Sequence, residues 1–532
     1  MVSRLAESVL IPPFPGTVAP GWLLSALERG LAGVTLFAPN VAAGPAALAG
    51  LTASLREAGG HPLVAVDEEG GDVTRLWYGS GSPYPGNAAL GAVDDTGLTE
   101  QVHAFIGADL LAVGVNLDLA PCLDVLAEPS NPVVGTRSFG PSADLVARHG
   151  AAAVRGLQSA GIAACAKHFP GHGSTVEDSH EELAVVSGSL ADVRDRDLPP
   201  FLAAVKAGVL TVMPGHLRVP ELTGALPASL SGPALSLLRA ELGFTGVIVT
   251  DALEMKAVSD AFGDGGGSVR ALAAGCDVMC LGRDVSEERY LAIRDAIAAA
   301  VRSGELPGER LEEASARAGA LRAELVSRHP AGSGTDTGSG ARDGSGIRDA
   351  SGSRDASGFG DASGASGART GLEAARRALR ETRQIARTTA GPAPSLDGAV
   401  VVEVEPTVNI AAGKAHWGLS GWVPPADLHR VAAAGGAVGG AGPEASVAAV
   451  VRAAQGRPLI VVFRDAHRSA DTRSFVTAVL AQRPDTVLVE MGLPYWMPPA
   501  STYEAHLATY GASRANTEAA AEYLGLTRHT SH

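Results

Sequence analysis

The chain has 532 residues, of which 57 are acidic and 42 are basic, so its formal net charge is −15. This length allows two to four domains, or one large barrel with a smaller partner domain. A hydrophobic fraction of 46% excludes a wholly disordered chain. The acidic balance argues against a nucleic-acid partner, because no excess of Lys and Arg is available to displace counterions from phosphates.

The chain opens without an apolar segment of signal-peptide type, and it contains no apolar run long enough to cross a membrane. We therefore expect a cytoplasmic protein with no membrane partner. The cysteines form no CxxC pair and lie in apolar, strand-like runs, which predicts buried thiols rather than a zinc site. They are Cys122, Cys165, Cys276 and Cys280. The sequence does not indicate the oligomeric state.

Residues 329–370 differ sharply in composition from the rest of the chain. They consist of degenerate Ser-Gly and Arg-Asp-Ala repeats with almost no apolar side chain to bury. Such a segment cannot offset the entropy of ordering, so we predict a flexible low-complexity linker. It separates an N-terminal domain (1–328) from a C-terminal part (371–532).

Within the N-terminal domain, short apolar runs alternate with amphipathic helical patterns. Continuous apolar strands with helices between them indicate a parallel sheet covered on both faces. Seven or eight such units favour a (β/α)₈ TIM-type barrel over an open doubly wound sheet, and no GxGxxG follows the first strand. The predicted strands are 34–38, 63–69, 114–121, 164–171, 210–216, 247–255 and 277–282, and helices are predicted over 98–114, 142–161 and 234–243.

Ionisable side chains stand at the C-terminal end of nearly every predicted strand. In a parallel barrel these ends meet on one face, where active sites are built, and burying so many charges for stability alone is costly. This placement predicts an enzyme. The residues are Asp67, Glu69, Asp118, Lys167, His168, His216, Asp251 and Glu254.

The segment AKHFPGHGSTVEDSHEEL (166–183) carries the densest chemistry. On its predicted loop Asp178 and His180 are two residues apart, so that the carboxylate can orient the imidazole and raise its basicity. The alternative is that both are ordinary exposed loop residues. The histidines of this segment do not have the spacing of a helical metal site, and we expect His172 to brace the turn.

KHFPGHG (167–173) followed by DSH (178–180) resembles the signature of β-N-acetylhexosaminidases of glycoside hydrolase family 3. DEEGGDVTRL (67–76), NPVVGTRSFG (131–140), VMPGH (212–216) and LGFTGVIVTDALEM (242–255) extend the resemblance, in the family's order, over roughly residues 8–325. Where the family often has DQEGGRV, this chain has Glu68 and Asp72 in place of an amide and a base. The added negative charge leaves local details near Asp67 open.

The resemblance implies a retaining mechanism with a covalent intermediate, in which Asp251 is the nucleophile and His180, oriented by Asp178, is the acid/base. Judged from the residue type alone, the alternative role for Asp251 is that of a helix N-cap. We expect Glu254 to be a helix-start or solvated residue. No metal or organic cofactor is implied. The residues that match the family's substrate contacts are Asp67, Arg75, Arg137, Lys167 and His168. For Arg75 the alternative is a salt bridge with Asp72 or Glu69, and for His168 it is a packed, hydrogen-bonded role at the end of the strand.

The C-terminal part is predicted to be a small α/β domain that resembles the second domain of longer family 3 enzymes. We predict helix over 371–395 and strands over 400–405, 458–463 and 485–492. Glu490 ends one of these strands, and it is the tempting analogue of the acid/base carboxylate in the β-glucosidase branch. Because the DSH loop is present, we expect Glu490 to be structural.

These observations favour an exo-acting β-N-acetylglucosaminidase whose partner is a small oligosaccharide or muropeptide, in peptidoglycan recycling or chitooligosaccharide turnover. A phosphorylase of the same family stays open, because a histidine acid/base leaves room for anionic phosphate as the acceptor. A β-glucosidase is less favoured, because its second catalytic carboxylate is not evident. A non-catalytic sugar-binding barrel is less favoured, since Asp178, His180 and Asp251 are all present.

Overall fold

The computed structural model describes residues 2–178, 183–283, 285–328, 362–383, 396, 398–406, 417–432 and 443–528. Among these residues, eight short strands form a closed parallel barrel in the N-terminal domain. Six of them make one sheet in the order β2-β3-β4-β5-β7-β9. Strand β1 pairs with β10, the Thr35 amide donates to the Pro12 carbonyl beside β1 (3.2 Å), and a parallel bridge between Val249 and Val278 joins β9 to β10. The TIM-type barrel is confirmed.

The barrel strands are shorter than the apolar runs that predicted them, because the runs continue into the loops at the C-terminal ends. One strand, β1, was not predicted. The bounds are β1 Leu10–Ile11, β2 Gly33–Thr35, β3 Leu63–Val66, β4 Leu117–Asp118, β5 Ala163–Phe169, β7 Thr211–Pro214, β9 Val247–Ile248 and β10 Met279–Cys280. A separate pair, β6 (Ala184–Val185) and β8 (Leu217–Arg218), lies outside the barrel sheet.

Helices cover the outside of the barrel, and the predicted helical segments are among them. Ser142 caps α7, since its side chain accepts a hydrogen bond from the Leu145 amide. The predicted helix over 234–243 is divided into α11 and a π-helical turn, Leu237–Glu241. The bounds are α1 Val2–Glu7, α2 Gly21–Arg29, α3 Ala38–Val41, α4 Pro45–Gly59, α5 Asn87–Val93, α6 Thr96–Ala112, α7 Ala143–Ser159, α8 Leu190–Arg196, α9 Leu198–Lys206, α10 Pro220–Thr223, α11 Gly232–Ser236, α12 Lys256–Ala274, α13 Glu287–Ser303 and α14 Gly308–Arg328.

The two ends of the barrel differ in chemistry. Helix α14 covers the N-terminal end, where its Leu321 and Leu325 join the apolar barrel interior. Its Arg322 donates to the carbonyls of Gly59, Gly60 and His61, directly before β3. The ionisable residues predicted from the sequence lie at the opposite, C-terminal end of the strands, as active-site residues do in barrels of this type.

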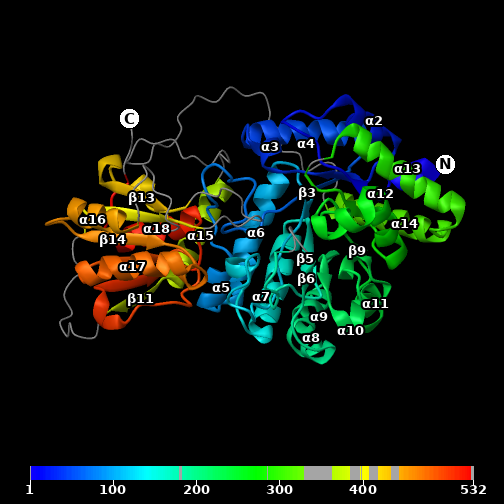
Figure 1. Cartoon of the computed structure of the whole chain (residues 1–532). Coiled ribbons are helices and arrows are strands. Elements are labelled where there is room, and N and C mark those ends of the chain that lie inside the picture. Colours follow the sequence, from blue (N-terminus) through cyan, green and yellow to red (C-terminus); the bar gives the residue numbers. More distant parts are fainter. Residues whose placement is uncertain are drawn as a thin grey trace, which may run out of the picture.

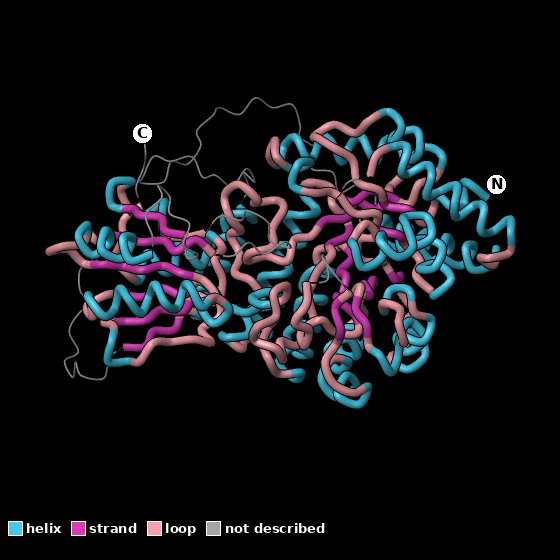
Figure 2. Tube along the Cα trace, viewed as in Figure 1, coloured by secondary structure: helices cyan, strands magenta, loops and turns pink. Residues whose placement is uncertain are grey.

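The C-terminal domain is a six-stranded sheet that lies beside the barrel (Figures 1 and 2). Its order is β11-β16-β15-β14-β12-β13, and all neighbours are parallel except β11 and β16. The predicted strands correspond to β12, β14 and β15. The bounds are β11 Arg380–Arg383, β12 Val400–Glu405, β13 Leu428–Ala432, β14 Leu459–Phe463, β15 Val487–Glu490, β16 Ala505–Ala508, α15 Ala362–Ala378, α16 Pro443–Ala453, α17 Ala470–Gln482 and α18 Arg514–Tyr523.

Helix α15 corrects two predictions. It begins at residue 362, so the last nine residues of the predicted linker 329–370 are helical, and residues 329–361 lie outside the described part. It ends at residue 378 and β11 follows, so the helix predicted over 371–395 was wrong over residues 379–383, and residues 384–395 lie outside the described part. At Gly367 and Gly371, close packing of the helix against the barrel outweighs the poor helix propensity of glycine. A Cβ atom at these positions would lie 2.6 Å from the Tyr84 hydroxyl and 2.1 Å from the Pro83 carbonyl oxygen.

This close approach places α15 between the two domains, in contact with α5 and α6 of the barrel and with α18 of the C-terminal domain (Figure 1). Arg377 of α15 forms an ion pair with Asp95 of the barrel (2.9 Å), and Arg380 donates to the Ala92 carbonyl (2.7 Å). The chain is therefore anchored on the barrel before it enters the C-terminal sheet.

A buried ion pair joins the domains on the side of the barrel strand ends. Asp72, 6% exposed, forms an ion pair with Arg464, which follows β14. The Thr136 hydroxyl and the Ala512 amide also donate to this carboxylate (2.6 and 2.9 Å). The departure from the family pattern at residue 72 is thus matched by a cation from the other domain.

Candidate active site

Five of the predicted site residues form one connected network at the C-terminal face of the barrel. Lys167 and His168 lie just before the last residue of β5, Phe169, while Asp67 and Arg75 follow β3. Arg137 ends a 3₁₀ turn, Gly135–Arg137, in the loop after β4. Their ion pairs and hydrogen bonds run through two further carboxylates, Glu69 and Asp124.

Lys167 is the first centre of this network. Its Nζ donates to Asp67 Oδ1 (2.7 Å) and lies 2.8 Å from Glu69 Oε1. Burial lowers the pKa of Lys167, but the two carboxylates outweigh it and raise this pKa above its ordinary value. For Asp67, burial acts to raise the pKa, whereas Lys167 and Arg75 leave it lowered. The side chain of Asp67 is still 21% exposed, against 2% for Glu69, so Asp67 can meet a ligand.

Glu69 joins Lys167 to Arg137 through a bidentate pair, with Arg137 Nε and Nη2 donating to its two oxygens (3.0 and 2.7 Å). Burial acts to raise the pKa of Glu69, yet the two cations hold it well below its usual range. Such charge-assisted, bidentate contacts fix the orientation of a guanidinium. Arg75 lies 3.8 Å from the other oxygen of Asp67, so its salt bridge is with Asp67 rather than with Glu69 or Asp72.

Asp124 is the second centre of this network, and it was not predicted from the sequence. Its carboxylate accepts from the ring Nδ1 of His168 (2.7 Å), from the backbone amides of His168 and His172 (3.2 and 2.7 Å) and from the Cys122 thiol (3.0 Å). This leaves His168 Nε2 as the acceptor that faces Arg137 Nη2 at 3.4 Å. Its position three residues beyond Pro121, where a predicted strand ends, was the available signal.

Asp251 follows β9 at the same face and is half-buried. Its Oδ1 accepts from the Ala252 amide (2.8 Å), and His216 Nε2 donates to the Ala252 carbonyl (3.0 Å), which fixes the backbone next to the carboxylate. Glu254 was expected to be a helix-start or solvated residue, and it lies two residues before α12 but is not solvated. It is half-buried, its Oε1 accepts from the Arg283 amide (2.7 Å), and burial raises its pKa.

Asp178 is the last described residue of the loop after β5 before residues 179–182, and His180 is outside the described residues. Asn131 braces this loop, since its Nδ2 donates to the carbonyls of His172 and Thr175 (2.9 and 3.0 Å). His172 braces the turn as predicted, with Nδ1 2.8 Å from the Thr175 hydroxyl. Burial lowers the pKa of His172 to about 4, which keeps its ring neutral at physiological pH.

Glu68 and Asp118 form a buried acidic pair behind Asp67. Glu68 Oε2 accepts from the amides of Arg75 and Leu76 (2.8 and 2.9 Å), and Asp118 Oδ1 accepts from the Glu68 amide (3.0 Å). Glu68 Oε1 and Asp118 Oδ2 have no hydrogen-bond partner among the described residues. Burial raises the pKa of Glu68 to about 7 and that of Asp118 well above its usual range.

Among the described residues, one group brings three potential metal-binding atoms within 4.8 Å of one another: Cys122, Asp124 and His168. Asp124 already accepts hydrogen bonds from both other side chains, and burial raises the pKa of Cys122 well above its usual range. A protonated thiol is a poor metal ligand. We therefore interpret the group as a hydrogen-bonded support for His168.

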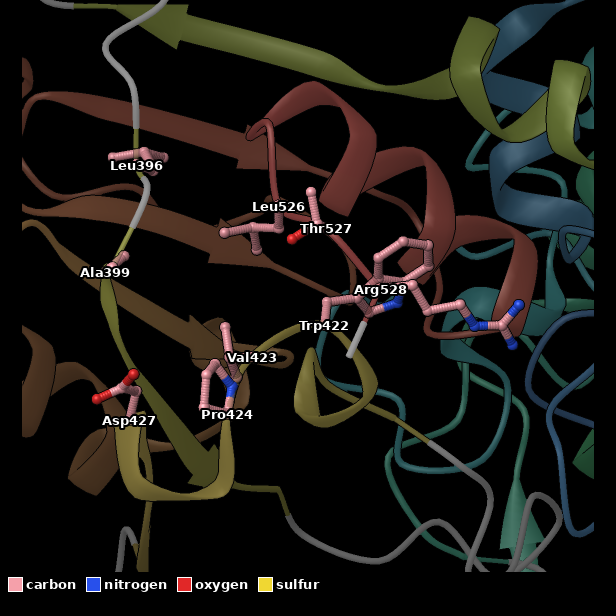
Figure 3. Close-up of a pocket in the computed structure, with 10 residues that line it drawn as sticks. Leu396, Ala399, Trp422, Val423, Pro424, Asp427, Leu526, Thr527 and Arg528 are labelled. Atoms are coloured by element: carbon pink, nitrogen blue, oxygen red, sulfur yellow. The ribbon is translucent and has the colours of Figure 1, made fainter. Parts of the chain in front are cut away.

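A cavity of about 380 Å³ in the C-terminal domain contains none of the predicted site residues (Figure 3). Trp422, Pro424, Leu526 and Arg528 are among its lining residues.

Glu490 is fully buried, and its carboxylate accepts from the amides of Asp465 and Gly492 (2.7 and 2.8 Å). These contacts support the structural role expected for Glu490.

Comparison with known proteins identifies the class of enzyme. The family model of the glycosyl hydrolase family 3 N-terminal domain matches residues 25–321. The chain belongs to glycosyl hydrolase family 3 and is a glycoside hydrolase. No described helix is long and apolar enough to cross a membrane.

Three relatives have informative names. Beta-hexosaminidase LpqI of Mycobacterium tuberculosis is 36% identical over 274 residues, which cover 50% of this chain and 70% of the relative. Beta-hexosaminidase A of Pseudoalteromonas piscicida is 33% identical over 340 residues, 58% of this chain and 56% of the relative. The structure of a family 3 beta-N-acetylglucosaminidase from Paenibacillus sp. is similar with a TM-score of 0.81 and 29% identity, covering 98% of this chain and 96% of that one.

Proposed function

We propose that the protein is a retaining exo-acting β-N-acetylglucosaminidase that removes a terminal β-linked N-acetylhexosamine from a small oligosaccharide or muropeptide. The observation that carries the proposal is the connected network of Asp67, Lys167, Glu69 and Arg137 on the barrel face that also holds Asp251. A fixed set of carboxylates and cations is suited to a small ligand rich in hydroxyl groups. The names of the relatives support the same substrate class.

In the first proposed step, the Asp251 carboxylate attacks the anomeric carbon, and the bond to the leaving oxygen breaks. His180 gives its proton to that oxygen, and Asp178 orients the imidazole and stabilises its charged form. In the second step, His180 takes a proton from water, whose oxygen attacks the same carbon and releases Asp251. The anomeric configuration is retained because the carbon is inverted twice.

Asp67 is the proposed anchor of the sugar, because it accepts from hydroxyl groups and is the most exposed carboxylate among those paired with Lys167. Lys167 and Arg137 reach the sugar as donors while Glu69 keeps them in place. Arg75 and His168 complete the proposed contacts, His168 through the nitrogen that Asp124 leaves available.

The test compares 4-nitrophenyl β-N-acetylglucosaminide with the corresponding β-glucoside, each with and without phosphate. We expect hydrolysis of the glucosaminide, with retention of configuration seen by NMR, and no requirement for phosphate. Formation of N-acetylglucosamine 1-phosphate in phosphate buffer would identify a phosphorylase, and preference for the glucoside would refute the substrate class.

Asp251→Ala should abolish turnover in this assay, because no other group is proposed to form the covalent bond. Asp260→Asn, on the exposed surface of α12, is the matched control and should retain activity. A folded Asp251→Ala protein with near-native rates would remove Asp251 from the role of nucleophile.

A further inference from the structure

Asp72 is contacted both by the C-terminal domain and by a second loop of the barrel. Its Oδ2 accepts from Arg464 and from the Thr136 hydroxyl (2.6 Å), and its Oδ1 accepts from the Ala512 amide (2.9 Å). Arg464 Nη2 also donates to the Thr136 hydroxyl oxygen (3.3 Å), so the three side chains form a closed ring of contacts. We call Asp72, Thr136 and Arg464 the interdomain ring.

The interdomain ring is shielded from solvent. Asp72 and Thr136 are 6% and 7% exposed, and the side chain of Arg464 is 13% exposed. Burial lowers the pKa of Arg464, but Asp72 and Asp465 outweigh it and raise this pKa above its ordinary value. Charge-assisted hydrogen bonds in such surroundings are screened little, so they hold their partners more firmly than a surface ion pair does.

Thr136 and Arg137 are neighbours in one 3₁₀ turn, and their side chains have different partners. The Thr136 hydroxyl donates to Asp72, whereas the Arg137 guanidinium donates to both oxygens of Glu69. The backbone of the turn is held as well, since Asn87 Nδ2 donates to the Arg137 carbonyl (2.7 Å). A displacement of the turn at Thr136 therefore moves the base of the Arg137 side chain.

The same two loops are thus joined at two points. Glu69 and Arg137 join them within the site network, and Asp72 and Thr136 join them at the domain interface. Two residues lie between Glu69 and Asp72, and none lies between Thr136 and Arg137. The contact with the C-terminal domain is therefore coupled to the sugar-binding network through a short stretch of chain on each side.

We propose that Arg464 is a positioning residue that, through Asp72 and Thr136, sets the position of Arg137 in the sugar-binding network. The C-terminal domain thus contributes to substrate affinity through a residue that does not itself touch the sugar. The inference rests on the proposed function, because Arg137 receives its contact with the sugar there. It also accounts for the acidic residue at position 72, since the base that the family often has at this position is supplied here by the other domain.

The test measures kcat and KM with 4-nitrophenyl β-N-acetylglucosaminide, and the inhibition constant of N-acetylglucosamine as a competitor. Thr136→Val removes the hydroxyl at nearly constant shape, and Thr136→Ser retains it. Thr52→Val is the matched control, because it removes another buried hydroxyl. That hydroxyl donates to the Val113 carbonyl (2.7 Å), before β4 and at the N-terminal end of the barrel strands.

We expect Thr136→Val to raise KM and the inhibition constant by about fivefold and to change kcat by less than about twofold, because it weakens a binding contact common to substrate and transition state. Thr136→Ser and Thr52→Val should match the parent protein. Arg464→Ala should raise KM by a similar factor, and Thr136→Val should add little to it. Arg377→Ala, which removes the ion pair with Asp95 between the domains, should keep the parent KM.

A second background establishes whether the effect runs through Arg137. In the Arg137→Ala protein, in which Lys167 still pairs with Glu69, Thr136→Val should have no further effect on KM. Circular dichroism and thermal unfolding establish that each variant is folded. If Arg137→Ala does not fold, the comparison of Thr136→Val with Thr136→Ser and Thr52→Val decides by itself.

An unchanged KM in Thr136→Val or in Arg464→Ala would overturn the proposal, and so would a loss confined to kcat. Additive effects of Thr136→Val and Arg137→Ala, or a KM raised equally by Thr52→Val, would overturn it as well. Failure of the proposed function is recognised separately, by a parent protein that does not cleave the glucosaminide. The same variants are then compared on the glycoside that the protein does cleave, with the same outcomes decisive.

Discussion

Glu68→Gln is expected to stabilise the protein at neutral and alkaline pH. In the structure Glu68 is 2% exposed, and burial raises its pKa from 4.5 to about 7. The folded state therefore holds a proton that the unfolded state has lost between these values, and the stability falls as the pH rises from 4.5 to 7. Because one pKa unit corresponds to about 1.4 kcal/mol, the loss is roughly 3 kcal/mol above pH 7.

A glutamine avoids this loss. Its carbonyl oxygen can accept from the amides of Arg75 and Leu76, as Glu68 Oε2 does, and it has no charge to desolvate. The entropy of unfolding is about 2.1 cal/mol/K per residue, so for a barrel of about 300 residues 3 kcal/mol corresponds to about 5 °C in Tm. We expect Glu68→Gln to raise the Tm of the barrel by about 5 °C at pH 8 and by only about 1 °C at pH 5.

Differential scanning calorimetry at one scan rate, with parent and variant compared at each pH, measures this effect. Groups that titrate equally in both proteins cancel in the difference. Glu309→Gln, at an exposed position of α14, is the control and should show no such pH-dependent gain. A Tm difference that stays constant between pH 5 and pH 8, or a variant less stable than the parent at pH 8, would refute the reasoning about Glu68.

Three further predictions follow from the interface and the proposed mechanism. Arg464→Ala should lower the calorimetric Tm by an amount equivalent to about 3 kcal/mol, because it leaves Asp72 buried without its cation. Adding Asp72→Ala should recover part of this loss, and an unchanged Tm in Arg464→Ala would contradict the prediction. His180→Ala should slow alkyl glycosides severely while sparing the first step with a dinitrophenyl glycoside, and azide should restore turnover as a β-glycosyl azide; equal losses without rescue would mean that His180 only binds substrate. Limited trypsin digestion should cut first within residues 329–361, and the two fragments should co-elute in gel filtration with activity retained; separation of the fragments would show that the interface does not hold them.

The barrel could be predicted because the features that specify it lie close together in the sequence. Apolar runs, helical periodicity and charged strand ends recur in every unit, and each repeats the same physical pattern. The C-terminal domain was predicted less completely, because β11, β13 and β16 were missed and α15 has a composition poor in helix-forming residues. Packing of Gly367 and Gly371 against the barrel decides that helix, and no window of sequence contains the barrel surface.

The motifs of the sequence pointed to residues that lie together in the structure. Asp67, Arg137 and Lys167 are joined in the structure, but Glu69, which joins them, was noted only as a strand-end residue. Asp124 was missed because its role depends on the loop after β4 meeting the end of β5, a contact between segments more than 40 residues apart. Partners of this kind become visible only when the chain is folded.

The position of α15 has a consequence for how this chain can evolve. Because α15, the Asp72–Arg464 pair and the hydrogen bond from His467 to the Pro129 carbonyl hold the domains against each other, no described contact between them depends on the length of the chain from 329 to 361. Insertions and deletions between residues 329 and 361 therefore leave the position of one domain relative to the other unchanged. A tract of short repeats, which gains and loses copies readily, can therefore persist at this point of the gene without cost to the enzyme.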